Sequence, residues 1–261
     1  MNEHPEDRPE RLLKGVIRYD GTDFWGWQVQ PRGITVQGVL EDALSRIANR
    51  SISVIGASRT DSGVHAFGQV FSFSWPMELG YERLPRALSG IIKPIVRIES
   101  IEPAPPGFHA RRSSTGKRYA YALALSRHPD PMISRYAWSI PWPIDVAHLE
   151  TLAQRCVGRH DFAGFASSGS PKANTERTIQ SITLHRGGFV QPIDGTEIWR
   201  LEFMGNGFLY HMVRNLMGTL VDVARGHFPE EWIDERLASP GPYRGYTAPG
   251  HGLALLEVFY E

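Results

Sequence analysis

The chain has 261 residues, 41% of them hydrophobic and 21% charged, and its 28 basic and 28 acidic residues give a net charge of +0. This composition is typical of a soluble globular protein. With no apolar run long enough to span a bilayer and no basic-then-apolar N-terminus, we expect a cytoplasmic protein without a membrane partner. The single cysteine, Cys156, excludes an internal disulfide, and without a cysteine pair or a His-x-x-His spacing no structural zinc site is expected.

The first half of the chain is predicted to alternate between strands and helices. Residues 1–11 are polar and punctuated by proline, which predicts a flexible tail. Hydrophobic periodicity and capping residues then predict a β-α-β-β-α-β order, with strands at 12–20, 51–57, 67–75 and 94–101 and helices at 35–48 and 82–92. The proline-rich stretch 103–107 predicts a stiff linker, so we expect a first domain at 12–106.

The second half, 107–261, is expected to repeat this order with one additional helix. Its predicted strands lie at 116–125, 178–186, 197–204 and 253–260, and its helices follow Asp145, span 208–225 and follow Pro229. The segment 127–143 is expected to be irregular, and no role is assigned to it. Two such halves predict an α+β protein made of tandem ferredoxin-like units whose antiparallel sheets join across a central cleft.

The connection between two predicted strands of the first half carries three functional groups within a few residues. The sequence there, 57–66, is Ala-Ser-Arg-Thr-Asp-Ser-Gly-Val-His-Ala, with Asp61 between Arg59 and His65. A neighbouring cation favours an ionised carboxylate, which is the form that a nucleophile requires. The alternative interpretation is a hairpin loop with a surface salt bridge, and these residues alone leave both interpretations open.

This stretch resembles the Arg-Thr-Asp-x-Gly-Val-His-Ala signature of the tRNA pseudouridine synthase A family. Ser58 and Ser62 stand where the family usually has glycine and alanine, but both residues are small and uncharged. The resemblance continues in the family's order over nearly the whole chain, through the motifs at 19–22, 25–28, 35–38, 108–111, 116–119, 205–215 and 247–249.

The resemblance implies an isomerase that converts uridine to pseudouridine at positions 38, 39 and 40 of the tRNA anticodon stem-loop, acts as a homodimer and needs no cofactor. Asp61 is implied to be the nucleophile, and the sequence leaves open whether it attacks C6 of the base or C1′ of the sugar. Arg59 is implied to contact the RNA as the uridine leaves its stack. Tyr119 is implied to stack on the target uracil, and Arg214 to pair with the Asp61 carboxylate.

Further candidates for RNA contact are three histidines and the positive residues of a stretch, 107–126, that contains no acidic residue. Arginine and lysine side chains bind phosphates, and each histidine could equally be a hydrogen-bonded structural residue. The candidates are His65, His109, Arg111, Lys117, Arg118 and His211.

The sequence also allows other roles for these residues and other functions for the protein. From the residues alone, Tyr119 could be a core tyrosine and Arg214 a solvated helix residue. A non-catalytic RNA-binding protein with RRM-like sheets is the main alternative, although it has little use for a carboxylate at Asp61. A glycosidase-type hydrolase requires two carboxylates, and no second acid accompanies Asp61 in these motifs.

Overall fold

The computed structural model describes residues 10–93, 95–167, 174–193, 195–238 and 241–261. These residues form two compact units, one made of residues 10–114 and 255–261 and the other of residues 115–254. The predicted tail lies outside the described residues as far as residue 9, while residues 10 and 11 already belong to a strand. No helix among the described residues is long and apolar enough to cross a membrane.

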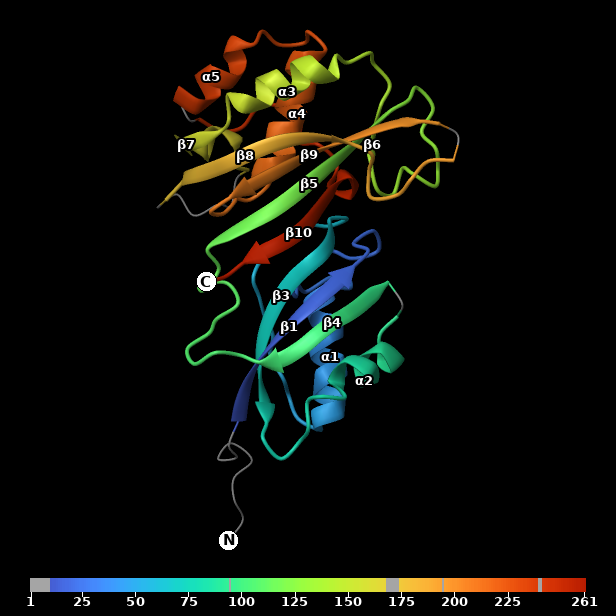
Figure 1. The fold of residues 1–261 in the computed structure, drawn as a ribbon, viewed down its shortest axis with the longest axis vertical. Helices are drawn as coiled ribbons and strands as arrows, with labels where there is room; N and C mark the ends of the chain where they lie inside the picture. The colour runs from blue at the N-terminus through green and yellow to red at the C-terminus, as the bar shows by residue number, and fades with distance from the viewer. Residues whose placement is uncertain (1–9, 94, 168–173, 194, 239–240) are drawn as a thin grey trace. The chain divides into compact units, whose positions relative to one another are not determined.

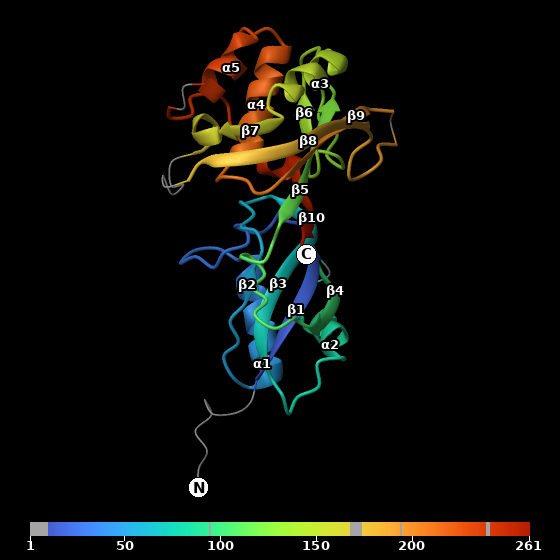
Figure 2. The same ribbon diagram turned by 60° about the vertical axis from the view of Figure 1, so that its left-hand side comes forward.

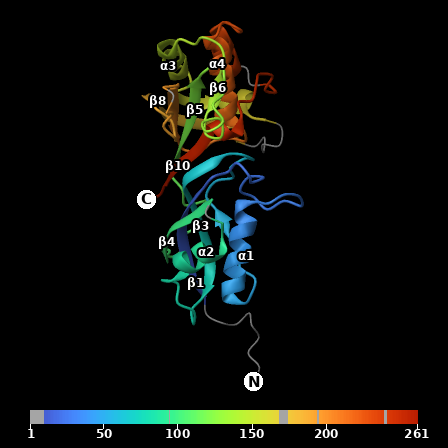
Figure 3. The ribbon, with the colours of Figure 1, turned by 90° about the vertical axis from the view of Figure 1, so that its right-hand side faces the viewer.

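The first unit is a small antiparallel sheet with two helices. The strand order is β4-β1-β3-β10, and β2 also pairs with β3. Antiparallel pairing joins β1 to β3 and to β4 (Figure 1, Figure 2). The helices contact each other, and α2 packs on β4 (Figure 3). The elements are β1 (Glu10–Tyr19), α1 (Val36–Ala48), β2 (Ile55–Gly56), β3 (His65–Pro76), α2 (Leu84–Ile91), β4 (Val96–Pro103) and the end of β10 (Leu253–Phe259).

The chain ends in the first unit, which differs from the boundary expected at residue 107. Residues 107–114 and 255–261 both group with the first unit. Two interactions hold them there: β10 is a hydrogen-bonded neighbour of β3, and the Tyr260 hydroxyl donates to the Ala110 carbonyl over 2.7 Å. Pairing between residues so far apart in the sequence cannot be predicted from the composition of the proline-rich stretch 103–107.

Helix α1 forms where its capping signal predicts it. The Thr35 side chain accepts a hydrogen bond from the Gly38 amide, and the helix ends at Asn49 in the left-handed conformation. The apolar face expected from the spacing, which includes Leu40 and Leu44, is buried. This element is confirmed.

The strand predicted at 51–57 is mostly wrong. Ile55 and Gly56 pair with β3, and the Ala57 amide donates to the Val70 carbonyl over 2.8 Å, so the pairing covers only the end of the predicted strand. The amides of Ile52 and Val54 instead donate to side chains of α1, to Ser45 Oγ over 2.9 Å and to Glu41 Oε1 over 2.8 Å. Because a helix takes these backbone donors, the β-branched run does not form a ladder.

The second unit carries its helices on one side of an antiparallel sheet (Figure 1). The strand order is β5-β9-β8-β7, and β6 lies parallel to β5. Helix α4 contacts both α3 and α5. The elements are β5 (Gly116–Leu125), β6 (Trp138–Ile140), α3 (Val146–Gln154), β7 (Gly158–Asp161), β8 (Glu176–Arg186), β9 (Glu197–Gly205), α4 (Met212–Ala224) and α5 (Glu231–Ala238), together with the beginning of β10.

Three local expectations for this unit need correction. Strand β7 was not expected, and β6 lies within the segment 127–143 that was expected to be irregular. Helix α4 begins at Met212 rather than near Phe208, because His211 adopts a left-handed conformation with φ of 60° and interrupts the helical backbone. The described part of the chain is therefore α+β, with mostly antiparallel strands.

Cys156 is buried, and it follows α3 rather than lying within it. Burial raises the pKa of the Cys156 thiol to about 12, with a further rise from Asp234 that Arg155 opposes. Since the thiolate is the reactive form, we expect iodoacetamide at about pH 8 to leave Cys156 unmodified in the folded protein and to alkylate it after unfolding in urea. Mass spectrometry of the two samples checks this, and rapid alkylation without urea would contradict it.

Candidate functional site

The loop that carries Asp61 is braced by the segment that follows β1. The Trp27 amide donates to the Thr60 carbonyl over 3.0 Å, and the Gly63 amide donates to the Phe24 carbonyl over 3.3 Å. The Tyr19 and Thr60 hydroxyls are hydrogen-bonded at 2.8 Å, with both side chains buried. Asp61 is thus flanked on both sides by backbone groups anchored to a distant part of the chain.

Two glycines allow this close approach. Gly26 has φ of +91°, and a Cβ there would lie 2.6 Å from the Thr60 carbonyl oxygen. A Cβ at Gly21 would overlap the carbonyl oxygen of Val64. Both glycines belong to the motifs at 19–22 and 25–28, so these motifs shape the Asp61 loop by leaving room for its backbone.

A buried glutamine holds the start of the same loop. Gln69 in β3 has no exposed surface, and its amide group bonds both polar groups of the Ser58 backbone. Oε1 accepts from the Ser58 amide over 3.1 Å, and Nε2 donates to the Ser58 carbonyl over 2.7 Å. The side chain thereby makes the pair of hydrogen bonds that the backbone of a neighbouring strand would make.

We expect Gln69→Leu to lower the free energy of unfolding by about 2–6 kcal/mol, because the substitution removes both hydrogen bonds to the buried Ser58 backbone, at about 1–3 kcal/mol each. Urea titration of both proteins measures the difference. Gln28→Leu is the matched control, since Gln28 makes an exposed side-chain hydrogen bond. An equal, small effect of both substitutions would show that Gln69 does not anchor the loop.

The charged groups of the loop differ in exposure. Asp61 is half-buried and Arg59 is exposed. His65 is buried, and its Nδ1 accepts from the Gly21 amide over 3.0 Å. His65 therefore supports the backbone of the brace.

In the second unit, Arg214 is held by the segment that contains Thr247-Ala248-Pro249. Its Nε donates to the Ala248 carbonyl over 2.7 Å. One turn further along α4, a Cβ at Gly218 would overlap the Tyr246 carbonyl oxygen, so glycine lets this segment lie directly on the helix. The Arg214 guanidinium is consequently fixed by a backbone contact at its base.

Two tyrosines of β5 share the strand face next to this segment. The Tyr119 ring is buried and lies edge-on to Phe208, with ring centroids 5.3 Å apart. The Tyr121 hydroxyl donates to the Pro249 carbonyl over 2.8 Å. Burial raises the pKa of Tyr121 well above its usual value, and the Arg214 charge opposes this rise. Tyr121 stays a neutral donor that positions the same segment from the sheet.

The remaining predicted RNA contacts are found in different surroundings. His109 closes a turn, because its Nδ1 accepts from the Arg111 amide over 3.2 Å, and the Arg111 side chain is exposed. Lys117 is half-buried, and Arg118 Nη1 lies 3.8 Å from Glu202. His211 Nδ1 lies 3.0 Å from the Ser167 hydroxyl.

The residues that position these groups were not predicted from the sequence. In the sequence, Gln69 stands out only as a polar residue on the otherwise aromatic face of the predicted strand 67–75. Asn215 is also buried, and it links Thr247 (Oγ1 to Oδ1, 2.7 Å) to the Phe165 carbonyl (2.8 Å from Nδ2). The signal that could have found Asn215 and Thr247 is that both lie in motifs of the resemblance.

Among the residues with described positions, no group of three or more His, Cys, Asp or Glu could hold a metal ion.

Comparison with known proteins agrees with these motifs. The family model described as tRNA pseudouridine synthase matches residues 16–111 and 152–261. The chain is 35% identical over 246 residues to a tRNA pseudouridine synthase A of Thermoanaerobacter sp. (strain X514), covering 94% of this chain and 98% of the relative. It is 40% identical over 253 residues to one of Moorella thermoacetica (95% and 99%) and 39% identical over 252 residues to one of Myxococcus xanthus (95% and 92%). The chain belongs to the tRNA pseudouridine synthase family.

Proposed function

We propose that the chain isomerises uridine to pseudouridine at positions 38, 39 and 40 of the tRNA anticodon stem-loop, with Asp61 as the nucleophile. Membership of the family makes it an isomerase that acts on tRNA. The observation that carries the proposal is the bracing of the Asp61 loop, since a nucleophile must be held in place before its substrate arrives.

The reaction needs one carboxylate and no exchange of electrons with a cofactor. The bond between uracil N1 and ribose C1′ breaks, a bond from C5 to C1′ forms, the C5 proton is lost, and N1 gains a proton. Asp61 attacks C6 of the base or C1′ of the sugar to start this exchange. No metal or redox group enters this scheme.

Three further side chains receive roles in the proposal. Tyr119 stacks on the uracil, and Arg214 keeps the Asp61 carboxylate charged. The exposure of Arg59 supports its role in contacting RNA as the uridine leaves its stack. The exposed side chain of Arg111, together with Lys117 and Arg118, supplies positive charge for phosphates.

The finer architecture and assembly are proposed with the function. The two units are taken as tandem ferredoxin-like halves, which the β4-β1-β3 order with β2 beside β3 supports for the first unit. By family resemblance the enzyme is a homodimer of the cytoplasm. Sedimentation at several protein concentrations tests the dimer independently of activity.

Release of tritium from tRNA labelled at uracil C5 tests the function. We expect release from tRNA with uridines at positions 38, 39 and 40, and none from a matched transcript that carries cytidine at all three. Unchanged release from the cytidine transcript would overturn the positions while leaving the chemistry intact. No release from any unmodified tRNA would overturn the function.

A further inference from the structure

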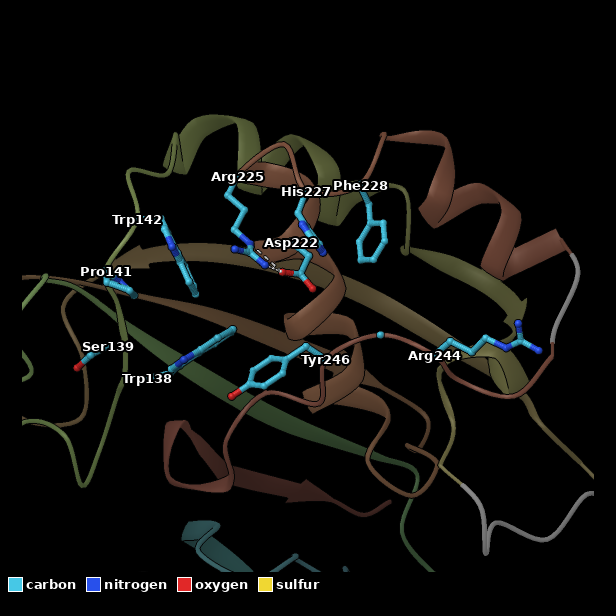
Figure 4. A pocket seen from close by; sticks show the side chains of 11 residues that line it. Trp138, Ser139, Pro141, Trp142, Asp222, Arg225, His227, Phe228, Arg244 and Tyr246 are labelled. Carbon is cyan, nitrogen blue, oxygen red and sulfur yellow. Dashed lines mark hydrogen bonds and ion pairs between the residues drawn. The ribbon is translucent and has the colours of Figure 1, made fainter.

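A cavity of about 400 Å³ lies in the second unit (Figure 4). Its walls come from β6, the end of α4 and the residues before Thr247. The volume is within the range of small-ligand pockets. The residues that matter for its chemistry are Trp138, Trp142, Asp222, Arg225, Arg244 and Tyr246.

Aromatic rings enclose one end of the cavity. Trp138 and Tyr246 lie with ring centroids 5.4 Å apart at 33°, and Trp142 stands on the other side (Figure 4). Trp142 is 43% exposed and Tyr246 is 51% exposed. Large apolar rings left open to solvent around a hollow are suited to stacking on a flat ligand, and nucleobases stack on such rings whatever their identity.

An ion pair between the buried Asp222 and the half-buried Arg225 forms one edge of the cavity. Arg225 Nε and Nη2 contact Asp222 over 2.8 and 2.6 Å, and both contacts end on Oδ1. The guanidinium also lies 4.3 Å from the Trp142 ring centroid, which holds it in place. In the described structure the second carboxylate oxygen of Asp222 keeps its acceptor capacity. Adenine, cytosine and guanine carry an amino group that donates to a carboxylate oxygen. Uracil offers only an N3–H between two carbonyl oxygens that the carboxylate repels, so this edge favours the other three bases over uracil.

The charges of the cavity suit one phosphodiester. The charges of Asp222 and Arg225 cancel each other, which leaves Arg244 as the other arginine of the lining. Arg244 is exposed, and its side chain points away from the aromatic end (Figure 4). A nucleotide with its base between the rings would place its phosphate toward this rim.

The cavity is connected to the proposed site through α4. Arg214, Gly218 and Asp222 follow one another at four-residue spacing, so they share one face of the helix. Arg214 and Asp222 are separated by about 12 Å along the axis. Tyr121 contacts both the cavity lining and the segment that holds Arg214. Its ring lies edge-on to Trp138 with ring centroids 6.3 Å apart, and its hydroxyl donates a hydrogen bond to the Pro249 carbonyl.

We infer that this cavity binds an unpaired nucleotide of the substrate tRNA whose base carries an amino group. The inference rests on the proposed function, because it takes the RNA to be the ligand that also presents the target uridine. The base lies among Trp138, Trp142 and Tyr246, its amino group donates to Asp222, and its phosphate meets Arg244. Such a site would hold the RNA without touching the reacting bonds.

Binding of the four nucleoside monophosphates, followed by ligand-observed NMR, tests the base preference on the intact chain. We expect AMP, CMP or GMP to bind at least about five-fold more tightly than UMP. Asp222→Asn should remove this preference, because an amide can also donate to the uracil carbonyl. Equal binding of all four by the unaltered protein, or no binding, would overturn the base assignment.

The affinity for tRNA at fixed salt tests the link to RNA. Trp142→Ala should weaken tRNA binding about five-fold or more, the effect of losing one stacking ring. Its kcat at saturating tRNA should stay within about two-fold, because lost ground-state binding raises KM alone. Met132→Ala is the control, since Met132 is 76% exposed in the same segment and outside the cavity lining.

The outcomes separate this inference from the proposed function. Neither binding assay requires turnover, so a chain without isomerase activity would refute the function and still report on the cavity. Monophosphate binding with unchanged tRNA affinity in Trp142→Ala would overturn the assignment to RNA and indicate a free nucleotide. Circular dichroism confirms that each variant is folded before it is compared.

Discussion

Replacing Asp61 with asparagine is expected to lower the rate of tritium release from C5-labelled tRNA by about 10⁴-fold or more, the scale of loss when an enzyme is deprived of its nucleophile. Asparagine has nearly the same size and keeps the hydrogen bonds of the loop backbone. The dissociation constant for tRNA should therefore change by no more than a few-fold. Single-turnover release and filter binding measure the two quantities separately.

The matched control is Asp42→Asn, which removes another carboxylate of the same unit. Asp42 lies in α1 with a side chain that is 70% exposed, and its ion pair to Arg46 spans 4.0 Å. We expect this variant to release tritium at the rate of the unaltered protein. Equal activity of Asp61→Asn and Asp42→Asn would remove Asp61 from the mechanism, and it would favour a role for the loop in binding alone.

The second large effect is expected from Gly26→Ala, which should lower the free energy of unfolding by about 2–5 kcal/mol. A left-handed backbone costs a non-glycine residue about 1–2 kcal/mol. The new methyl group also lies 2.6 Å from the Thr60 carbonyl oxygen, and such overpacking costs about 1–3 kcal/mol. Relief of the contact must move the backbone that carries Asp61, so the rate should fall even where the variant remains folded.

Gly107→Ala separates the two contributions. Gly107 has φ of +75°, but a Cβ there would meet nothing within 4 Å. This control should lose only the conformational part, about 1–2 kcal/mol, and keep its rate. Urea titration and tritium release of both variants supply the comparison. If Gly26→Ala were no worse than Gly107→Ala in either measurement, the bracing of the Asp61 loop by segment 21–27 would be unimportant.

Local signals determined several elements from the sequence alone. Thr35 and the apolar spacing after it predict α1, and the alternation at 116–125 predicts β5 with its observed bounds. The motif around Asp61 identified the family that the comparisons then showed. These features are predictable because a cap, a periodicity or a motif is complete within a few consecutive residues.

Elements that depend on distant partners could not be predicted in this way. The run at 51–57 has strand-like residues, yet Glu41 and Ser45 of α1 bond its amides. The start of α4 depends on the backbone conformation of His211, which hydrogen-bonds the distant Ser167. In both cases a tertiary contact competes with local propensity and wins, because the bonds it supplies replace those of the regular element.

The sequence by itself determined the family, the carboxylate at Asp61 and the order of most strands and helices. Only the tertiary structure decided that Gln69 imitates a strand for Ser58, that Gly26 makes room for Thr60, and that aromatic residues from separate segments enclose a cavity beside Asp222. The physical reason is that the functional groups of a protein follow from its residue types, which the sequence gives directly. Positioning depends on close contacts between segments far apart in sequence, and those exist only once the chain has folded.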